Sequence, residues 1–266
     1  MDIVVINLDV HTERWRESQA RFAALHLSVT RLSAVNGQHL PICQREQLQD
    51  AGLNRRQHHK PLRPGEIGCY ASHMAVWRQL LDTSAPMLAV FEDDIEPSPA
   101  LPTVLRAIES AAPDWDLIKL FGRSRERVRE RMTLAPQAEL VAYHRVPSHT
   151  CAYVVSRRGA QKLLASRLPF GRPIDVDIRH WWENDLQVRG VLPYPVREAE
   201  CSLTSTIDDG RRGVSSAPMR LHKLYLQLRY TLLNRYHAGV VGSAHDASRH
   251  RANDVFGEPT APRDAT

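Results

Sequence analysis

The most informative pattern along the chain is a short apolar run that ends in three acidic residues. Residues 87–91 are all apolar, and Glu92, Asp93 and Asp94 follow without a break. Such a run is typical of a strand that is buried on both faces of a mostly parallel sheet. The acids would then lie at the carboxyl end of the strand, which is where open α/β sheets bind ligands.

The first 35 residues predict a strand–helix–strand unit that places further polar residues at the same edge of the sheet. Residues 3–8 are apolar enough for a strand, residues 13–25 have the periodicity of an amphipathic helix, and residues 29–35 again resemble a strand. A right-handed parallel strand–helix–strand unit would place Asn7, Asp9 and Arg14 at a cleft beside the strand ends. Helix capping and ordinary surface charge explain these three residues equally well.

A helix is predicted to begin at Pro64, because proline favours the first turn and Glu66 lies beside the positive helix end. Its buried stripe includes Ile67 and Met74, while Glu66 and His73 belong to another face. Ser72 and His73 are polar groups inside a largely apolar helix, so they need hydrogen-bond partners. A structural role for His73 and a functional one both remain open.

The rest of the chain predicts further strands and helices. We expect a short helix at 44–50 followed by a mobile loop to residue 61, a strand at 116–121, paired strands at 140–146 and 150–155, a helix at 157–165, and a last strand at 188–196 that prolines make an edge or a bend. Alternating arginines in residues 123–131 predict a basic segment close to the cleft rim. The fold class is therefore α/β with a mixed, mostly parallel central sheet flanked by helices.

Residues 173–185 combine acidic and aromatic side chains. Asp175 and Asp177 alternate with apolar residues, so on a strand or strand-like loop both would point to one face. Trp181 and Trp182 follow, with Glu183 and Asp185 close behind. Tryptophans beside carboxylates suit a sugar ring, although packing explains adjacent tryptophans at least as well.

The C-terminal part divides into two segments. Residues 211–241 include a basic amphipathic helix, which could lie on an anionic membrane surface or cover the domain's own core. Residues 242–266 are polar without periodicity and are predicted to be disordered. The remaining residues, 1–210, form the predicted main domain.

Composition limits the function classes. The formal charge of +5 favours anionic partners, but no RNA-binding aromatic motif or helix-turn-helix pattern is evident, so we expect no nucleic-acid binding. The four cysteines are widely spaced, which argues against structural zinc and disulfides. No signal peptide or membrane span is evident, so we expect a cytoplasmic protein, peripheral on the membrane face if the basic helix docks there.

Several blocks together carry a resemblance to a known family. Residues 6–9 and 34–37 (INLD, AVNG), 65–73 (GEIGCYASH), 90–98 (VFEDDIEPS) and 149–164 (HTCAYVVSRRGAQKLL) occur in the order seen in family 25 glycosyltransferases, which the chain resembles. That family includes bacterial lipopolysaccharide and lipooligosaccharide sugar transferases, with collagen galactosyltransferases as relatives. The matches cover roughly residues 1–205, and the GEIGC and EDD blocks together make the resemblance specific.

The resemblance implies a Rossmann-like, A-type glycosyltransferase fold and inverting transfer of a hexose, galactose or glucose, from a UDP-sugar to a lipopolysaccharide-type glycan or glycolipid acceptor. It places the family's acidic motif on Glu92, Asp93 and Asp94 and its helix motif on Glu66, Gly68, Cys69, Ser72 and His73. A later family block corresponds to residues 173–175. At residues 149–151 this chain departs from the small residues of its relatives, so the acceptor side is not defined.

The chemistry of such a transfer assigns roles to these residues. A carboxylate-bound Mn²⁺ or Mg²⁺ would hold and neutralise the diphosphate, with Asp94 as direct ligand and Asp93 or Glu92 assisting. One base must accept the acceptor's proton, for which Asp175 or Asp177 is expected, with Glu66 and Asp185 as further candidates. The expected donor- and cofactor-binding residues are Asn7, Asp9, Arg14, Ser72, His73, Glu92 and Asp93.

Two other functions are compared with the transferase for the same sequence. A basic, non-catalytic adaptor would bind an anionic membrane or nucleic acid through residues 123–131 and 220–235. A metal-dependent phosphohydrolase is disfavoured, because a two-metal site needs further clustered His and Asp ligands that the sequence does not present.

Overall fold

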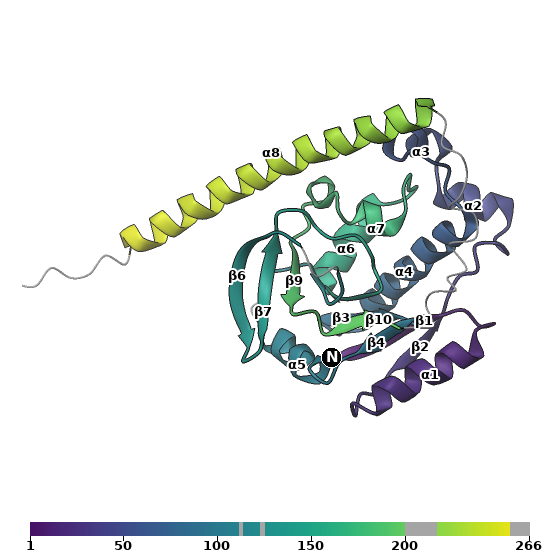
Figure 1. Ribbon diagram of the computed structural model, residues 1–266, viewed down its shortest axis with the longest axis horizontal. Coiled ribbons are helices and arrows are strands. Elements are labelled where there is room, and N and C mark those ends of the chain that lie inside the picture. The colour runs from purple at the N-terminus through teal and green to yellow at the C-terminus, as the bar shows by residue number, and fades with distance from the viewer. Residues whose placement is uncertain (112–113, 123–125, 200–216, 256–266) are drawn as a thin grey trace, which may run out of the picture.

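An eight-stranded sheet forms the centre of the protein (Figure 1). The structure, a computed structural model, describes residues 1–111, 114–122, 126–199 and 217–255, the last sixteen by backbone alone. The strand order is β2-β1-β3-β8-β5-β9-β7-β6. The strands are β1 (Asp2–Asn7), β2 (Thr30–Ser33), β3 (Met87–Glu92), β5 (Leu117–Lys119), β6 (Val128–Ala135), β7 (Ala138–Tyr143), β8 (Ala152–Ser156) and β9 (Val188–Leu192).

The sheet is mixed. β1 is parallel to β2 and β3, and β5 is parallel to β9. β8 is antiparallel to β3 and β5, and β7 is antiparallel to β9 and β6, so β7 and β8 run against the direction of the other strands. A separate two-stranded sheet joins β4 (Ile95–Pro97) to β10 (Val196–Glu198). The predicted α/β class with a mixed, mostly parallel sheet is confirmed.

Alternating side chains of β1 and β3 fill two hydrophobic cores, one on each face of the sheet. Ile3, Val5 and Phe91 pack in the core that contains Phe22 of α1 (Thr12–Ala23) and the buried side of α5 (Leu101–Ser110). Val4 and Val90 pack in the opposite core, against α4 (Pro64–Asp82) and α6 (Arg157–Ser166). Burial on both faces explains why these two strands are almost entirely apolar.

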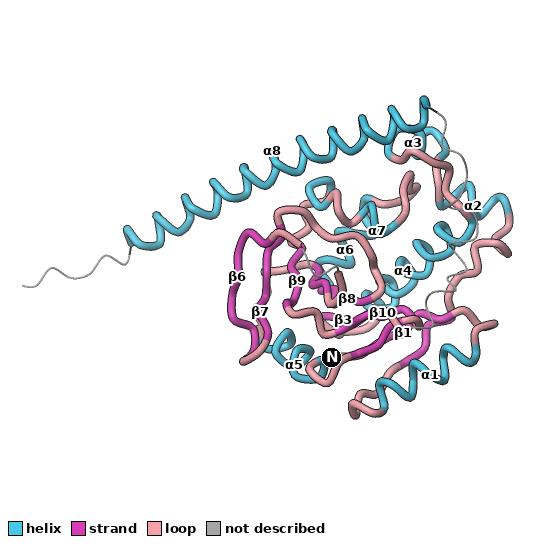
Figure 2. The backbone as a smooth tube through the Cα atoms, viewed as in Figure 1, coloured by secondary structure: helices cyan, strands magenta, loops and turns pink. Residues whose placement is uncertain are grey.

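The remaining helices lie on the α4 side (Figures 1 and 2). They are α2 (Ile42–Leu48), α3 (Ala51–Gln57), the short α7 (Ile174–Asp177), the 3₁₀ turn η1 (Trp181–Glu183) and the long α8 (Ala217–Val255). Asn234 fastens α8 to the body, since it accepts a hydrogen bond from Trp181 Nε1 at 3.2 Å and donates to the His144 carbonyl at 2.7 Å. No helix within the described residues has the length and apolarity needed to cross a membrane.

Several local predictions were wrong. The strands expected to pair at 140–146 and 150–155 do not pair, because β7 lies between β6 and β9 while β8 lies between β3 and β5. The predicted loop before residue 61 contains α3, and the predicted last strand is split into the interior strand β9 and the separate β10. The tail expected to be disordered from residue 242 continues α8 to Val255; the rest of it, and the boundary expected at 210, lie outside the described residues.

The adjacent tryptophans pack against α8. The Trp182 ring stacks on His237 with ring centroids 5.6 Å apart, and its centroid is 5.5 Å from that of Tyr230. Trp181 contacts His237 edge-on. The packing interpretation of this pair therefore describes the structure better than a sugar-binding platform.

Candidate active site

The candidate site lies where strands of the same direction end together. β1, β3 and β5 run the same way, so Asn7, Glu92 and Lys119 reach one edge of the sheet. β8 runs the opposite way, so Thr150 and Cys151 reach this edge just before it begins. The structure therefore brings the acidic run to the carboxyl edge, as the sequence predicts.

Asp93 is the acid held by the first strand. Its Oδ2 accepts a hydrogen bond from Asn7 Nδ2 at 2.5 Å, and its Oδ1 lies 3.8 Å from Arg14 Nη1. Burial raises the pKa of Asp93, and the contacts with Asn7 and Arg14 partly offset this effect. Asn7 is itself oriented by Arg31, whose Nε donates to Asn7 Oδ1 at 2.9 Å. The predicted proximity of Asn7, Arg14 and the acids is thus present.

Glu92 is held from the other side. Thr150 Oγ1 donates to Glu92 Oε1 at 3.3 Å, and His73 Nε2 lies 3.4 Å from the same oxygen. The other ring nitrogen of His73 contacts the Tyr153 hydroxyl, which also accepts a hydrogen bond from Trp77 Nε1. Burial opposes ionisation of Glu92, but the interactions with His73 and Thr150 outweigh it, so the pKa of Glu92 is lowered.

Asp94 differs from its two neighbours. The described residues include no cation within ion-pair distance of its carboxylate. The Asp94 backbone amide donates a hydrogen bond to this carboxylate, and the Asp94 backbone carbonyl accepts one from the Ala199 amide at 2.9 Å. Burial and the negative charges of Glu92 and Asp93 raise its pKa to about 7. At neutral pH a carboxyl group with this pKa is only partly ionised. A positive charge placed beside it would favour the fully ionised form.

Helix α4 brings its polar residues to the edge through one close contact. A Cβ at Gly68 would lie 2.4 Å from the Val35 carbonyl oxygen, so only glycine lets the helix approach this loop. Ser72 reinforces the contact, because its hydroxyl accepts a hydrogen bond from the Val35 amide and donates to the Gly68 carbonyl. The Ser72 hydroxyl therefore holds α4 against this loop. Its geometry does not support the predicted contact of Ser72 with the nucleotide-sugar donor.

The two candidate bases Asp175 and Asp177 differ in the contacts that they make. Asp177 is buried on α7, not on a strand: one oxygen contacts Tyr70 Oη, and the other binds Arg167 at 3.0 Å and Arg172 at 2.5 Å. Asp175, two residues earlier on α7, is half-buried, and its charge adds to the effect of burial in raising the pKa of the Cys69 thiol. Asp177 is saturated by structural contacts, which leaves Asp175 as the base candidate of this pair.

Three further predicted residues lie in different settings. Glu66 is half-buried and accepts a hydrogen bond from the Arg63 amide at 2.8 Å, which caps α4. Asp9 is exposed and pairs with Arg31 at 3.0 Å. Asp185 contacts Lys162 beside Asp116, at the edge where β5 begins, so it lies at the opposite end of the sheet from Glu92. Asp185 is removed from the candidates on this ground.

Two donor sets at this edge could hold a cation. Asp94 and Glu92 offer the oxygen ligands that Mg²⁺ and Mn²⁺ prefer. Cys69 Sγ, His73 Nε2 and a Glu92 oxygen lie within 4.8 Å of one another and would suit zinc. Burial and the nearby carboxylates raise the pKa of Cys69 well above its usual value, so its thiol keeps the proton that a metal must displace. The oxygen set is the better fit.

Sequence reasoning missed Lys119, although a lysine inside an apolar strand was a visible signal. It is fully buried, and its ammonium group donates to the carbonyls of Pro147, Ser148 and His149. Burial lowers its pKa to about 8, while the charge of Asp175 acts in the opposite direction. Lys119 thus fixes the loop that leads into Thr150 and supplies positive charge beside Asp175.

Two well-formed cavities do not lie over the acids. They have volumes of about 600 and 700 Å³ and lie between α8 and the body, and their walls contain none of Glu92, Asp93 and Asp94. We place the candidate site at the acids nevertheless, because convergent polar groups and perturbed pKa values indicate chemistry better than volume does.

Comparison with known proteins gives a matching family model and several similar proteins. The model of glycosyltransferase family 25, described as LPS biosynthesis protein, matches residues 1–178. Human procollagen galactosyltransferase 2 is 31% identical over 183 residues, which are 66% of this chain and 29% of that protein. A glycosyltransferase 25 family member of Drosophila pseudoobscura pseudoobscura is 31% identical over 185 residues, 66% and 28% of the two chains.

One relative carries a different description. A cattle protein described as a probable inactive glycosyltransferase 25 family member 3 is 31% identical over 153 residues, 50% of this chain and 25% of that protein. The chain spans under a third of the length of each of these curated relatives. Residues 1–178, which the family model matches, include the acidic run and α4.

Proposed function

The chain belongs to glycosyltransferase family 25, and from that premise we propose that it transfers a hexose, galactose or glucose, from a UDP-sugar to a hydroxyl of a lipopolysaccharide- or lipooligosaccharide-type glycan. The transfer inverts the configuration at the sugar and uses a divalent cation. The observation that carries this proposal is the environment of Asp94: a carboxyl group at the carboxyl edge of the sheet, with a pKa raised to about 7 and no ion-pair partner among the described residues.

Asp94, with Glu92 beside it, would hold the cation. When bound, Mn²⁺ or Mg²⁺ would neutralise the charge of the departing diphosphate. Asp93 is less suited as a ligand than predicted, because Asn7 and Arg14 already engage its two oxygens. Its proposed task is to position Arg14, whose guanidinium can donate charge-assisted hydrogen bonds to phosphate oxygens.

Asp175 is the proposed base. Inversion in one displacement requires a single group that accepts the proton of the attacking hydroxyl, and a half-buried carboxylate meets this need. The charge of Asp175 interacts with that of Lys119, which supplies positive charge on this side of the site. Glu66 is the second candidate, although one of its oxygens already caps α4.

Contact with an anionic membrane surface is part of the proposal and is supported by α8. Leu221, Leu224, Leu228 and Leu232 are each at least half exposed and form an exposed leucine stripe along α8. Residues 217–239 contain basic but no acidic residues. A helix with this composition binds anionic bilayers through its apolar stripe and its flanking charges.

Vesicle flotation tests the membrane contact. We expect binding to phosphatidylglycerol vesicles at low salt, little binding to phosphatidylcholine vesicles, and loss of binding in the double variant Leu224→Glu, Leu228→Glu. Ile42→Glu is the control, because Ile42 is an exposed apolar residue on another helix, α2. Equal binding by all three proteins would disprove the role of α8.

A basic adaptor without activity is the alternative, favoured by the same exposed stripe. It predicts vesicle binding but neither binding nor turnover of a UDP-sugar. Thermal-shift and hydrolysis screening of UDP-galactose and UDP-glucose, with Mn²⁺ and with a chelator, separates the two functions. Mn²⁺-dependent stabilisation and slow release of the hexose support the transferase, whereas the absence of both with either sugar would refute it. Cytoplasmic location stays a prediction.

A further inference from the structure

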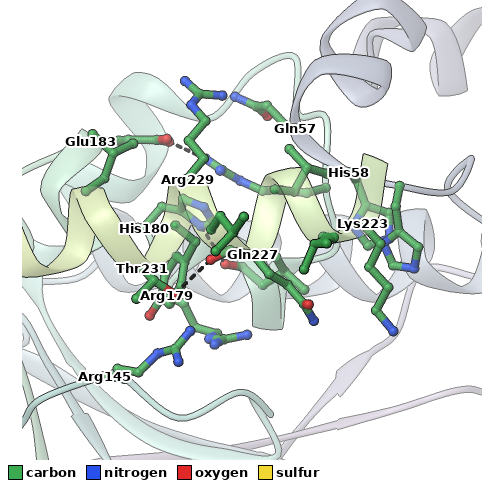
Figure 3. Close-up of a pocket in the computed structure, with 18 residues that line it drawn as sticks. Gln57, His58, Arg145, Arg179, His180, Glu183, Lys223, Gln227, Arg229 and Thr231 are labelled. Atoms are coloured by element: carbon green, nitrogen blue, oxygen red, sulfur yellow. Dashed lines mark hydrogen bonds and ion pairs between the residues drawn. The ribbon is translucent and has the colours of Figure 1, made fainter. Parts of the chain in front are cut away.

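A strongly basic cavity lies between α8 and the body (Figure 3). Its volume is about 600 Å³, and the cationic groups in its wall include Arg145, Arg179, Lys223 and Arg229. Glu183 is the acid among its described lining residues, and Arg167 and Arg172 already pair with it. The cavity therefore has an excess of positive charge that the described residues do not neutralise.

Two arginines are stacked against one aromatic ring in this cavity. The guanidinium carbons of Arg145 and Arg179 lie 4.9 and 4.7 Å from the centre of the Tyr230 ring. No described carboxylate lies within ion-pair distance of either guanidinium. Placing two like charges beside one ring is unfavourable unless an anion shares them.

Polar atoms in the same unit lack partners. Tyr230 is 6% exposed, and its hydroxyl group makes no hydrogen bond with any described residue; the same is true of Arg179 Nε. Buried polar atoms are almost always hydrogen-bonded in a complete structure, to protein, water or a ligand. Arg179 Nε can only donate and the Tyr230 hydroxyl can also donate, so one acceptor group would satisfy both.

Burial, with a smaller effect of nearby positive charge, lowers the pKa values of two histidines in the cavity. Burial, followed by the charges of His59 and Lys60, lowers the pKa of His58 to about 4. Burial and Arg172 lower the pKa of His180 to about 4 as well. Both rings therefore stay neutral at physiological pH and leave the arginines as the charged groups.

We propose that Arg145, Tyr230 and Arg179 form a binding site for a phosphate group. Arginine forks match phosphate oxygens, and the Tyr230 hydroxyl adds a donor between them. Leu224 and Leu228 of the exposed leucine stripe also line this cavity, whereas Leu221 and Leu232 do not. A lipid headgroup and a soluble ester carry the same phosphate chemistry, and we assign the site to a soluble or protruding phosphate ester because it adjoins the loop that Lys119 holds at the catalytic edge.

The site is one loop away from the catalytic edge. The neighbouring cavity of about 700 Å³ shares Arg145 and Arg179 and is also lined by Pro147 and Ser148. Lys119, beside Asp175, holds the carbonyls of these two loop residues. If the proposed transferase function is correct, on which this step alone rests, the phosphate belongs to the acceptor and anchors it while a hydroxyl reaches Asp175.

The test titrates glucose 6-phosphate, with glucose as the uncharged control, by calorimetry and by tryptophan fluorescence. Trp182 reports on the site because its ring centroid lies 5.5 Å from that of Tyr230. We expect saturable binding of glucose 6-phosphate alone, and an affinity at least about tenfold lower in each of Arg145→Gln and Arg179→Gln, the loss expected for one charge-assisted hydrogen bond. Arg78→Gln, at an exposed residue of α4, should bind like the wild type.

Further arms keep this test separate from that of the transferase. UDP binding with Mn²⁺ should be unchanged in Arg145→Gln, and glucose 6-phosphate binding should be unchanged in Asp94→Asn. The charge-preserving Arg179→Lys should fold normally and still lose affinity. Absence of saturable binding, equal binding by wild type and both glutamine variants, or loss of anionic-vesicle binding in those variants would overturn the assignment to a soluble phosphate ester.

Discussion

At the scale of single residues, three consecutive acids have three different environments. Thr150 and His73 hold Glu92, Asn7 and Arg14 hold Asp93, and Asp94 has no such partner. The sequence identifies the acidic run because it follows an apolar strand directly. It cannot divide the roles, because the partners come from β1, α1, α4 and the loop before β8.

Asp175 and Asp177 illustrate the limit of local patterns. Their spacing predicts one shared face of a strand, but the chain forms a short helix and only Asp177 reaches Arg167 and Arg172. No pattern in the sequence predicts that these two arginines pair with Asp177. The prediction of Asp185 as a candidate base fails for the same lack of a local signal. Its partner Lys162 lies at the opposite edge of the sheet from Glu92.

The two aspartates should respond differently to the same substitution. Asp177→Asn leaves two buried arginines underpaired and should lower the free energy of unfolding by about 3 kcal/mol or more. Asp175→Asn should leave stability unchanged and lower kcat by about 10²- to 10⁴-fold, the usual contribution of a general base.

Urea denaturation and steady-state kinetics measure the two effects. Asp82→Asn, at an exposed residue of α4, is the control for both. If Asp177→Asn kept full stability and lost activity, the roles assigned to the two residues would be reversed.

At the scale of elements, the sequence predicted best what is buried on both faces. β1 and β3 are nearly uninterrupted apolar runs, and α4 begins at the expected proline, so all three lie close to their predicted positions. Pairing partners were harder to predict. β7 and β8 are neighbours in sequence, yet β7 pairs with β6 and β9 while β8 pairs with β3 and β5, and no local pattern encodes that choice.

The position of α4 should depend on Gly68. A methyl group there would lie 2.4 Å from the Val35 carbonyl oxygen and 2.6 Å from the Gly37 amide nitrogen, and backbone cannot move aside cheaply. We expect Gly68→Ala to cost about 1 to 3 kcal/mol in stability. It should also displace Cys69 and His73 and so weaken UDP binding in the presence of Mn²⁺.

Thermal unfolding and calorimetry check this prediction against Gly239→Ala. Gly239 lies on α8, and an added Cβ meets no atom within 4 Å. Alanine there should leave the melting temperature unchanged or raise it slightly, because alanine favours helix. Similar destabilisation by both substitutions would mean that the contact at Gly68 is not special.

At the scale of the whole molecule, α8 has two different faces. The sequence predicts a basic amphipathic helix and leaves open whether it covers the core or a membrane. In the structure Tyr230 and Asn234 face the body while a leucine stripe faces solvent, so one helix has apolar groups on both sides. Only the placement of α8 on the body could reveal this second face and the cavity beneath it.

Stability should fall as the pH is lowered from 7 to 5. His58 and His180 have pKa values of about 4 in the folded protein, against 6.5 when unfolded. Between these values the unfolded chain binds more protons, so stability is present above pH 6.5 and is lost as the pH falls toward 4. Urea midpoints should therefore drop less steeply in the double variant His58→Gln, His180→Gln. An unchanged slope would show that the two rings do not control it.

The most direct test of the proposed function measures UDP binding to Asp94→Asn by calorimetry, with and without Mn²⁺. We predict that the wild type binds UDP in an Mn²⁺-dependent manner. The variant should keep its fold and melting temperature, lose that dependence and show no sugar transfer. Wild-type affinity and turnover in the variant, or full wild-type activity in a chelator, would contradict the assignment of Asp94 as the ligand of a catalytic cation.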